Sequence, residues 1–364
     1  MQHIMDNSPK KTILRVESID YLRGLAALSI LAYHMHLFTF GEVDSSSMLG
    51  KLKIYGVSIF YILSGITLYI VYANRLYLNK SDLIGFYIKR FFRLVPLLWL
   101  ATILTLIFQY NPEIMTLKKI VLNVTIIPGA IRPEGFIASG AWSIGNEIFF
   151  YLFFPFIIYL GRINKAFIYM SLLLSFVALY YFAFYILDPN VALGAQWSNY
   201  VNPLGQIFYF FTGIALGSIG GLVPRKNIIT GILILVFSAL FYTYQVFGEP
   251  VQLVTGLNKM ILSFYITVIC FLFYKFDFES FNEYLKDVLQ FFGNISYSLY
   301  LLHPITYGIV GSLLGFFAIK SSIALITLTV VFSILFAWLS YVYFEKFFIK
   351  LGKKYHDKAI LKFK

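Results

Sequence analysis

The sequence predicts an all-α, polytopic integral membrane protein with about ten transmembrane helices. Three observations support this fold class: 59% of the 364 residues are hydrophobic, only 13% are charged, and the mean hydropathy is +0.78. An ordinary soluble domain carries about 25% charged residues. A soluble fold of this length also leaves roughly a quarter of its unfolded surface exposed to water. An apolar excess of this size therefore requires a bilayer.

Ten apolar runs are candidate transmembrane helices, because a helix needs about 20 residues to cross about 30 Å of hydrocarbon. The runs lie at 20–40, 54–73, 94–110, 141–160, 167–187, 204–222, 228–247, 257–274, 289–311 and 321–344. The runs at 94–110 and 257–274 are short. The segment 111–140 is a candidate to fold back into the membrane.

The distribution of basic residues predicts the orientation. An even number of spans puts both ends of the chain on one side, and 22 of the 29 lysines and arginines then lie on that side. The positive-inside rule predicts that this side is cytoplasmic, so the topology is N-in and C-in. The chain divides into a cytoplasmic N-terminal tail, 1–18, a single membrane domain, 19–345, and a basic cytoplasmic tail, 346–364.

The net charge of +12 does not indicate nucleic-acid binding, because the basic residues are spread between apolar runs and do not form a basic domain. The tail can rest on anionic lipid. The one cysteine, Cys270, excludes an intramolecular disulfide, and no metal-ligand or nucleotide-binding spacing occurs.

Arg23 and His34 are candidate functional residues in the first span, because an ionisable side chain inside the membrane costs several kcal/mol. They are separated by three helical turns, so they share a face about 16 Å apart along the axis. Arg23 is then at the cytoplasmic mouth and His34 in the outer half of the bilayer. The alternatives are a snorkelling anchor for Arg23 and a hydrogen-bonded packing residue for His34.

Glu147 lies in the fourth span, between Trp142 and Tyr151. This span enters from outside, so Glu147 is about 9 Å below the outer surface, near the depth of His34. We therefore expect a His34–Glu147 pair in which the carboxylate orients the imidazole and raises its basicity. The alternative, an isolated structural carboxylate, is disfavoured by the cost of its desolvation.

His303 lies at a similar depth in the ninth span, directly before Pro304, which frees a backbone carbonyl. It is either a second residue of the site, in contact with substrate, or a polar plug beside a kink.

Arg90 and Arg93 lie three residues apart at the cytoplasmic end of the third span and share a helix face. Two guanidinium groups there suit a phosphate-rich ligand. The alternative is ordinary positive-inside charge.

The ionisable residues of the spans together suit an anionic donor bound from inside and a neutral acceptor reached from outside. The same residues suit a proton-coupled transporter equally well.

Six motifs resemble those of the acyltransferase-three family, the membrane O-acyltransferases of bacterial surface polysaccharides. They are Arg23-x10-His34, Phe60-Tyr-Ile-Leu-Ser-Gly65, Arg90-x-x-Arg93-Leu-x-Pro96, Trp142-Ser-x-x-x-Glu147-x-x-x-Tyr151, Ser296-Tyr-Ser-Leu-Tyr-Leu-Leu-His303-Pro304 and Glu345-Lys-Phe347. They occur in family order, so the resemblance covers residues 18 to about 352.

The resemblance implies transfer of an acyl group, usually acetyl, from a cytoplasmic acyl-CoA to a sugar hydroxyl on the far side of a bacterial cytoplasmic membrane. The family pattern implies that Arg23 and His34 are an essential pair. His34 would take part directly in the reaction, and Glu147 would complete the catalytic site. Arg90 and Arg93, with Arg23, are expected to bind the CoA phosphates.

We assign Trp142, Tyr151 and His303 to substrate binding. The expected partners are acyl-CoA, a carbohydrate acceptor and membrane lipid, without a metal ion. The chain ends about twenty residues after its last span, so we expect the form of the family without an extra C-terminal extracellular hydrolase-like domain. The alternative function is a transporter or flippase of a lipid-linked saccharide with a His34–Glu147 proton relay.

Overall fold

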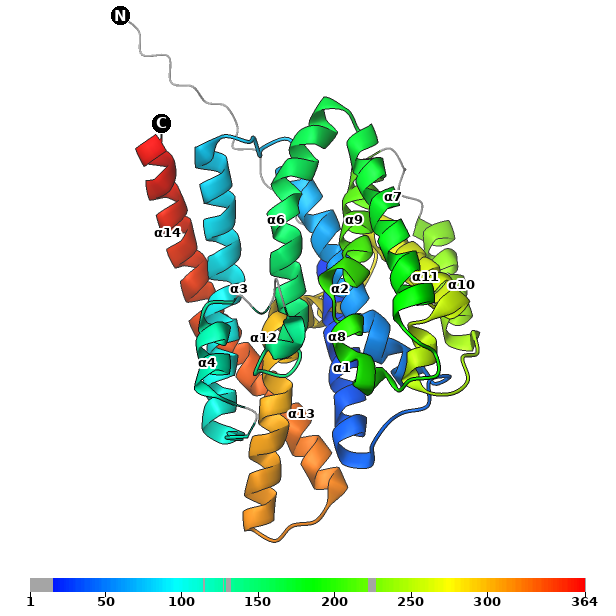
Figure 1. Ribbon diagram of the computed structural model, residues 1–364, viewed down its shortest axis with the longest axis vertical. Coiled ribbons are helices and arrows are strands. Elements are labelled where there is room, and N and C mark those ends of the chain that lie inside the picture. Colours follow the sequence, from blue (N-terminus) through cyan, green and yellow to red (C-terminus); the bar gives the residue numbers. More distant parts are fainter. Residues whose placement is uncertain (1–15, 114, 127, 129–131, 222–226, 364) are drawn as a thin grey trace, which may run out of the picture.

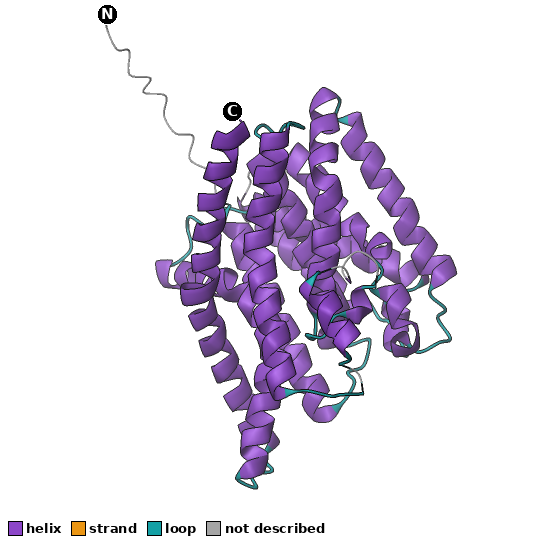
Figure 2. Cartoon of the chain, turned by 60° about the vertical axis from the view of Figure 1, so that its left-hand side comes forward, coloured by secondary structure: helices purple, strands orange, loops and turns teal. Residues whose placement is uncertain are grey.

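The computed structural model describes residues 16–113, 115–126, 128, 132–221 and 227–363, and every regular element in those ranges is helical (Figures 1 and 2). Each of the ten predicted runs lies on a helix. These are α1 (Glu17–Phe40), α2 (Met48–Tyr72), α3 (Lys80–Phe108), α6 (Ala141–Ile163), α7 (Ala166–Tyr181, continued by the π-helical Phe182–Ile186), α9 (Pro203–Gly220), α10 (Asn227–Thr243), α11 (Gly256–Lys275), α12 (Glu283–Phe316) and α13 (Ser322–Leu339). The predicted all-α membrane fold is confirmed.

Eight helical segments in the described ranges are long and apolar enough to cross a membrane. Two of the ten predicted spans are not among them. Helix α10 is apolar but has only 17 residues. Helix α1 has 24 residues, but Arg23, His34 and His36 lower the hydropathy of its apolar part.

The remaining elements complete the described chain. They are α4 (Leu117–Val124), α8 (Trp197–Tyr200), α14 (Lys346–Phe363), the 3-10 turns Pro133–Gly135, Leu193–Gln196 and Pro250–Leu253, and the π-helical Ser340–Glu345. Helix α14, predicted as a basic tail, lies beside α3 (Figure 1), where the rings of Phe92 and Tyr355 stack 5.5 Å apart. The C-terminal end therefore lies on the same side as the turn between α2 and α3.

Helix α3 begins fourteen residues before the predicted apolar run. Asn79 caps its first turn by accepting a hydrogen bond from the Asp82 backbone N–H at 2.8 Å, which starts the helix in a polar stretch. Arg90 and Arg93 therefore lie in the middle of a long helix, on one of its faces as predicted.

Helices α1 and α12 approach each other closely at Gly24 and Gly293. A Cβ atom on Gly24 would lie only 2.7 Å from the Gly293 nitrogen, so neither position has room for a side chain. This contact sets the spacing of the two helices that carry Arg23, His34 and His303.

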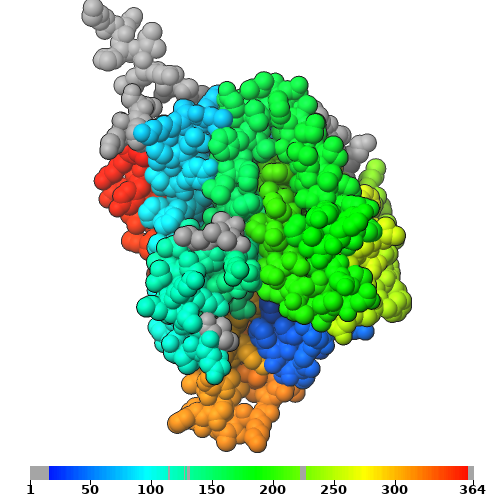
Figure 3. Space-filling view, viewed as in Figure 1, coloured from blue at the N-terminus to red at the C-terminus, as the bar shows by residue number. Residues whose placement is uncertain are grey.

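The segment between α3 and α6 folds against the bundle. Figure 3 shows its surface, in teal, below α3 and next to α12. Asn123 holds it together by accepting from the Ile137 N–H at 2.9 Å and donating to the Gly135 carbonyl at 3.0 Å. Gly140, with φ +78°, then starts α6 in the left-handed region that favours glycine.

Candidate functional site

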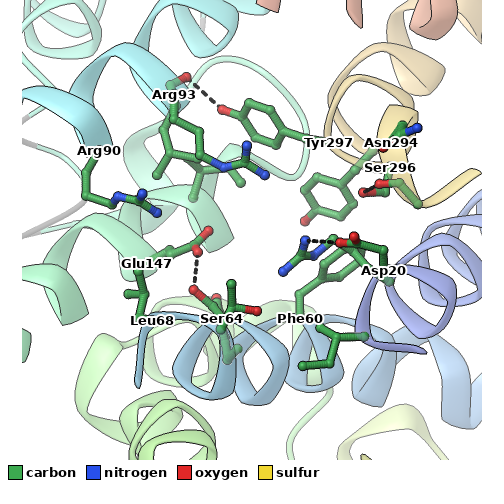
Figure 4. Close-up of a pocket in the computed structure, with 18 of the residues that line it drawn as sticks. Asp20, Phe60, Ser64, Leu68, Arg90, Arg93, Glu147, Asn294, Ser296 and Tyr297 are labelled. Carbon is green, nitrogen blue, oxygen red and sulfur yellow. Dashed lines mark hydrogen bonds and ion pairs between the residues drawn. The ribbon is translucent and has the colours of Figure 1, made fainter. Parts of the chain in front are cut away.

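A cavity of about 630 Å³ lies among α1, α2, α3, α6, α12 and the passage from α13 to α14. The charged residues that line it are Asp20, Arg23, Arg90, Arg93, Glu147 and Lys346. Figure 4 shows Arg90, Arg93 and Glu147 directed toward the same space. The structure thus brings together four predicted site residues from three helices, Arg23, Arg90, Arg93 and Glu147, and adds Tyr151 to the lining.

Arg23 is held at the side of the cavity by its own helix. Its Nη1 lies 3.2 Å from Asp20 Oδ1, one turn earlier on α1. Both side chains are largely buried, with 16% and 15% of their surfaces exposed. The close approach of Gly24 to α12 fixes this turn of α1 against the cavity wall.

Arg90 is surrounded by aromatic rings. Its guanidinium carbon lies 5.7 Å from the Tyr72 ring centroid, 6.0 Å from that of Phe86 and 5.9 Å from that of Tyr151. Its Nη2 donates to the Tyr72 hydroxyl at 3.5 Å. Its Nε is buried and has no hydrogen-bond partner among the described residues. A buried guanidinium with an unused donor is suited to an anionic ligand.

Glu147 is held by hydroxyl groups. Ser64 Oγ donates to its Oε1 at 2.6 Å, and the Tyr151 hydroxyl, one turn later on α6, donates to the same oxygen. Ser64 and Tyr151 also lie 3.1 Å apart, oxygen to oxygen. The carboxylate is therefore fixed in the cavity by α2 and α6.

The predicted pairing of His34 with Glu147 is wrong. The Tyr300 hydroxyl donates to the Gly140 carbonyl at 3.0 Å, so α6 starts level with Tyr300, well before the end of α12 at Phe316. Glu147 is seven residues further along α6, and His303 is three residues further along α12, which runs in the opposite direction. At 1.5 Å per residue these offsets separate Glu147 from the histidines by about 15 Å along the bundle.

His34 pairs instead with His303. His34 Nδ1 and His303 Nε2 lie 2.7 Å apart, and the two rings stack with their centroids 4.9 Å apart. His303 Nδ1 lies 2.8 Å from the Leu299 carbonyl oxygen, which can only accept. His303 therefore carries its proton on Nδ1 and accepts at Nε2 from His34 Nδ1–H. This arrangement leaves the lone pair of His34 on Nε2.

Trp142 lies in the first turn of α6, outside the lining of the cavity. Its ring packs against those of Trp197 and Tyr200, at centroid distances of 5.8 and 5.7 Å. Its assignment to substrate binding remains a prediction.

A layer of four residues, Phe60, Tyr61, Ser143 and Tyr300, lies at the end of the cavity toward the histidine pair. All four line the cavity, whereas His34 and His303 do not. The Tyr300 hydroxyl lies 2.8 Å from Ser143 Oγ, and the Tyr61 hydroxyl donates to the Ser143 carbonyl at 3.2 Å. We call these residues the Tyr300 layer. It separates the arginine-lined cavity from the histidine pair.

Sequence reasoning missed Ser64, Tyr300 and Lys346. All three lie within quoted motifs, namely Phe60–Gly65, Ser296–Pro304 and Glu345–Phe347, and these motifs are the available signal. Lys346 was assigned to the tail.

Comparison with known proteins identifies relatives of this chain. The profile of a family described as an acyltransferase domain matches residues 16–342. The peptidoglycan O-acetyltransferase OatA of Listeria monocytogenes is 28% identical over 158 residues. That match covers 38% of this chain and 24% of the Listeria protein, so the chain spans about a quarter of that relative's length. No solved structure shows significant similarity to the chain.

Proposed function

This chain belongs to the acyltransferase-three family, and on that premise we propose that it is a membrane O-acyltransferase acting on a surface polysaccharide or its lipid-linked precursor. It takes an acyl group, most simply acetyl, from acyl-CoA on the cytoplasmic side of a bacterial inner membrane. The acceptor is a sugar hydroxyl on the other side. The similarity to a peptidoglycan O-acetyltransferase supports both the acetyl group and a carbohydrate acceptor.

The observation that carries the proposal is the cationic cavity. Arg23, Arg90 and Arg93 border it, and the buried Nε of Arg90 has no partner in the described part of the chain. The phosphates of CoA are suited to guanidinium groups, which bind phosphate oxygens through paired N–H donors. The extended pantetheine arm could then carry the thioester toward the Tyr300 layer.

His34 is the proposed general base. Its Nε2 takes the proton of the sugar hydroxyl as that oxygen attacks the thioester carbonyl. The carbon–sulfur bond then breaks, and the thiolate takes that proton from His34 Nε2 to leave as free CoA, which restores the base. His303 keeps the other His34 nitrogen protonated throughout, so that Nε2 is the basic atom. The rival route forms an acyl-His34 intermediate first. Labelled acyl-enzyme trapped without acceptor would favour that route.

The test is mass spectrometry of the surface glycan from a deletion strain complemented with variants. His34→Ala is expected to lower acylation at least a hundredfold, the scale of a lost general base. Glu147→Gln is also expected to abolish transfer while leaving expression intact. His36→Ala is the matched control, because its ring lies two residues further along α1 and packs against Phe40 and not against His303, and it should keep acylation near wild type.

Normal acylation by His34→Ala at wild-type expression would refute the assignment of His34 as the general base.

CoA binding separates the proposed acyltransferase from a transporter. The purified chain should bind CoA, and Arg93→Ala should weaken that binding. Absence of CoA binding together with acceptor-independent substrate movement would favour the transporter.

A further inference from the structure

The passage from α13 to α14 is a π-helical segment, Ser340–Glu345, that borders the cavity. Tyr341 and Lys346 both line the cavity, and Lys346 Nζ lies 4.6 Å from the centroid of the Tyr341 ring. Residues five apart in an α-helix point about 140° away from each other. The i to i+5 bonds of a π-helix instead place them one above the other. The π-helical segment is therefore what brings this lysine over this ring.

The same segment turns Glu345 away from the cavity. Glu345 is only 4% exposed and accepts a hydrogen bond from Ser298 Oγ on α12. Ser340 Oγ lies 3.1 Å from the same Ser298 oxygen. The carboxylate next to Lys346 in sequence is thus committed to α12. Among the described carboxylates, none forms an ion pair with Lys346.

The charges on the cavity wall do not balance. Four cations, Arg23, Arg90, Arg93 and Lys346, face the two carboxylates of Asp20 and Glu147. Asp20 pairs with Arg23, and Glu147 is bonded to hydroxyl groups. The excess positive charge suits a ligand with more than one phosphate.

Lys346 differs from the arginines in its position. It is exposed, whereas the Arg23 side chain is largely buried and Arg90 Nε is fully covered. It therefore marks the rim of the cavity, and the arginines mark its interior. CoA carries its 3′-phosphate at the end of the molecule opposite the thioester, and its diphosphate between the two.

We infer that Lys346, seated on the Tyr341 ring, is the subsite for the 3′-phosphate of the acyl donor, while the arginines take the diphosphate. The inference rests on the proposed function, because it deepens the assignment of the donor. The ammonium group supplies a compact point charge for one phosphate, and the ring holds it at the rim.

The test compares the dissociation constants of CoA and dephospho-CoA for the purified full chain by calorimetry. Lys346→Gln is expected to weaken CoA binding about tenfold, the scale of one charge-assisted hydrogen bond, and to leave dephospho-CoA binding nearly unchanged. Lys350→Gln is the control, since it makes the same charge change one turn later on α14 at an exposed position outside the cavity. It should change neither constant.

A second variant, Tyr341→Leu, removes the ring and keeps the lysine. It should produce the same selective weakening of CoA binding, and it tests the subsite even where Lys346→Gln folds poorly. Equal weakening of both ligands by Lys346→Gln would overturn the inference, since that lysine would then contact the diphosphate. Unchanged binding of both, as for a lysine bound only to lipid phosphate, would also overturn it. If the wild-type chain binds neither CoA nor dephospho-CoA, the proposed function itself fails, because CoA is then not the donor.

Discussion

Replacing Gly24 with alanine is expected to disturb both the packing and the chemistry of this protein. The added Cβ would lie 2.7 Å from the Gly293 nitrogen and 2.8 Å from the Phe292 carbonyl carbon. Both atoms belong to the α12 backbone, which cannot move aside as a flexible side chain can. Helices α1 and α12 must therefore separate, and the same two helices carry the His34–His303 pair.

The size of the separation follows from these distances. Ordinary van der Waals contact of a Cβ atom begins near 3.4 Å, so the 2.7 Å gap must widen by about 0.7 Å. A rigid shift of that size would lengthen the 2.7 Å His34–His303 contact to about 3.4 Å, beyond a good hydrogen bond. Overpacking costs about 1–3 kcal/mol, and the gain of alanine over glycine in a helix offsets about 0.5–1 kcal/mol of this.

Two measurements check the expectation: the thermal midpoint of the purified protein and acylation of the glycan at matched expression. Gly24→Ala should lower the midpoint by a few degrees and lower transfer about tenfold or more. Gly311→Ala, on the same α12, is the control, because its nearest neighbour atom would be 3.9 Å away at Leu325 Cδ1. A Gly24→Ala variant with both wild-type values would refute the argument that this contact sets the histidine geometry.

Two further substitutions separate roles in the site from roles in stability. Tyr151→Phe removes one of the two hydroxyl donors of Glu147 and should lower transfer about tenfold, because a hydrogen bond to a charged group contributes about 1.5–3 kcal/mol. Its effect should not add to that of Ser64→Ala, since both hydroxyl groups bond the same oxygen. A wild-type rate of transfer by Tyr151→Phe would contradict this. Lys51 is fully buried, and its Nζ donates to the carbonyls of Phe241 and Tyr242 at the end of α10, at 3.2 and 2.6 Å. Lys51→Met should lower the thermal midpoint and leave transfer per folded molecule unchanged, and an unchanged midpoint would show that these bonds do not stabilise the fold.

The helices could be predicted because each apolar run is separated from the next by polar residues. Their ends could not be predicted as well. Helix α3 continues through Lys80–Arg93 because Asn79 caps it and its polar residues favour a helix as readily as a loop. Hydrophobicity marks where a helix meets lipid and does not mark where the helix begins.

The inner half of the site could be predicted better than the outer half. Arg23, Arg90, Arg93 and Glu147 meet in one cavity because ionisable side chains in a bilayer gather where they can be solvated or paired. The predicted pairing of His34 with Glu147 is wrong because the prediction counts the depth of Glu147 from the membrane surface at the start of its span. Helix α6 starts deeper, at Gly140, and no apolar pattern reports the hydrogen bond from Tyr300 that marks this depth.

The sequence predicts Lys346 as the first residue of the tail, because an apolar run does not show whether a helix is α or π. One wider turn at Ser340–Glu345 changes which side chains face inward. The basic residue nearest the end of the last run thereby becomes part of the cavity wall.

The Tyr300 layer also bears on how a cell could tolerate such a protein in an energised membrane. The proposed function joins a donor on one side of the membrane to an acceptor on the other, so it needs a passage, and a water-filled passage would dissipate the proton gradient. The cavity ends at hydroxyl groups bonded to each other and to backbone carbonyls, with an aromatic ring of Phe60 6.0 Å from that of Tyr300. Under the proposed function, an acyl chain would cross this layer only by displacing these side chains, and the closed layer would limit the leak of protons and ions between turnovers.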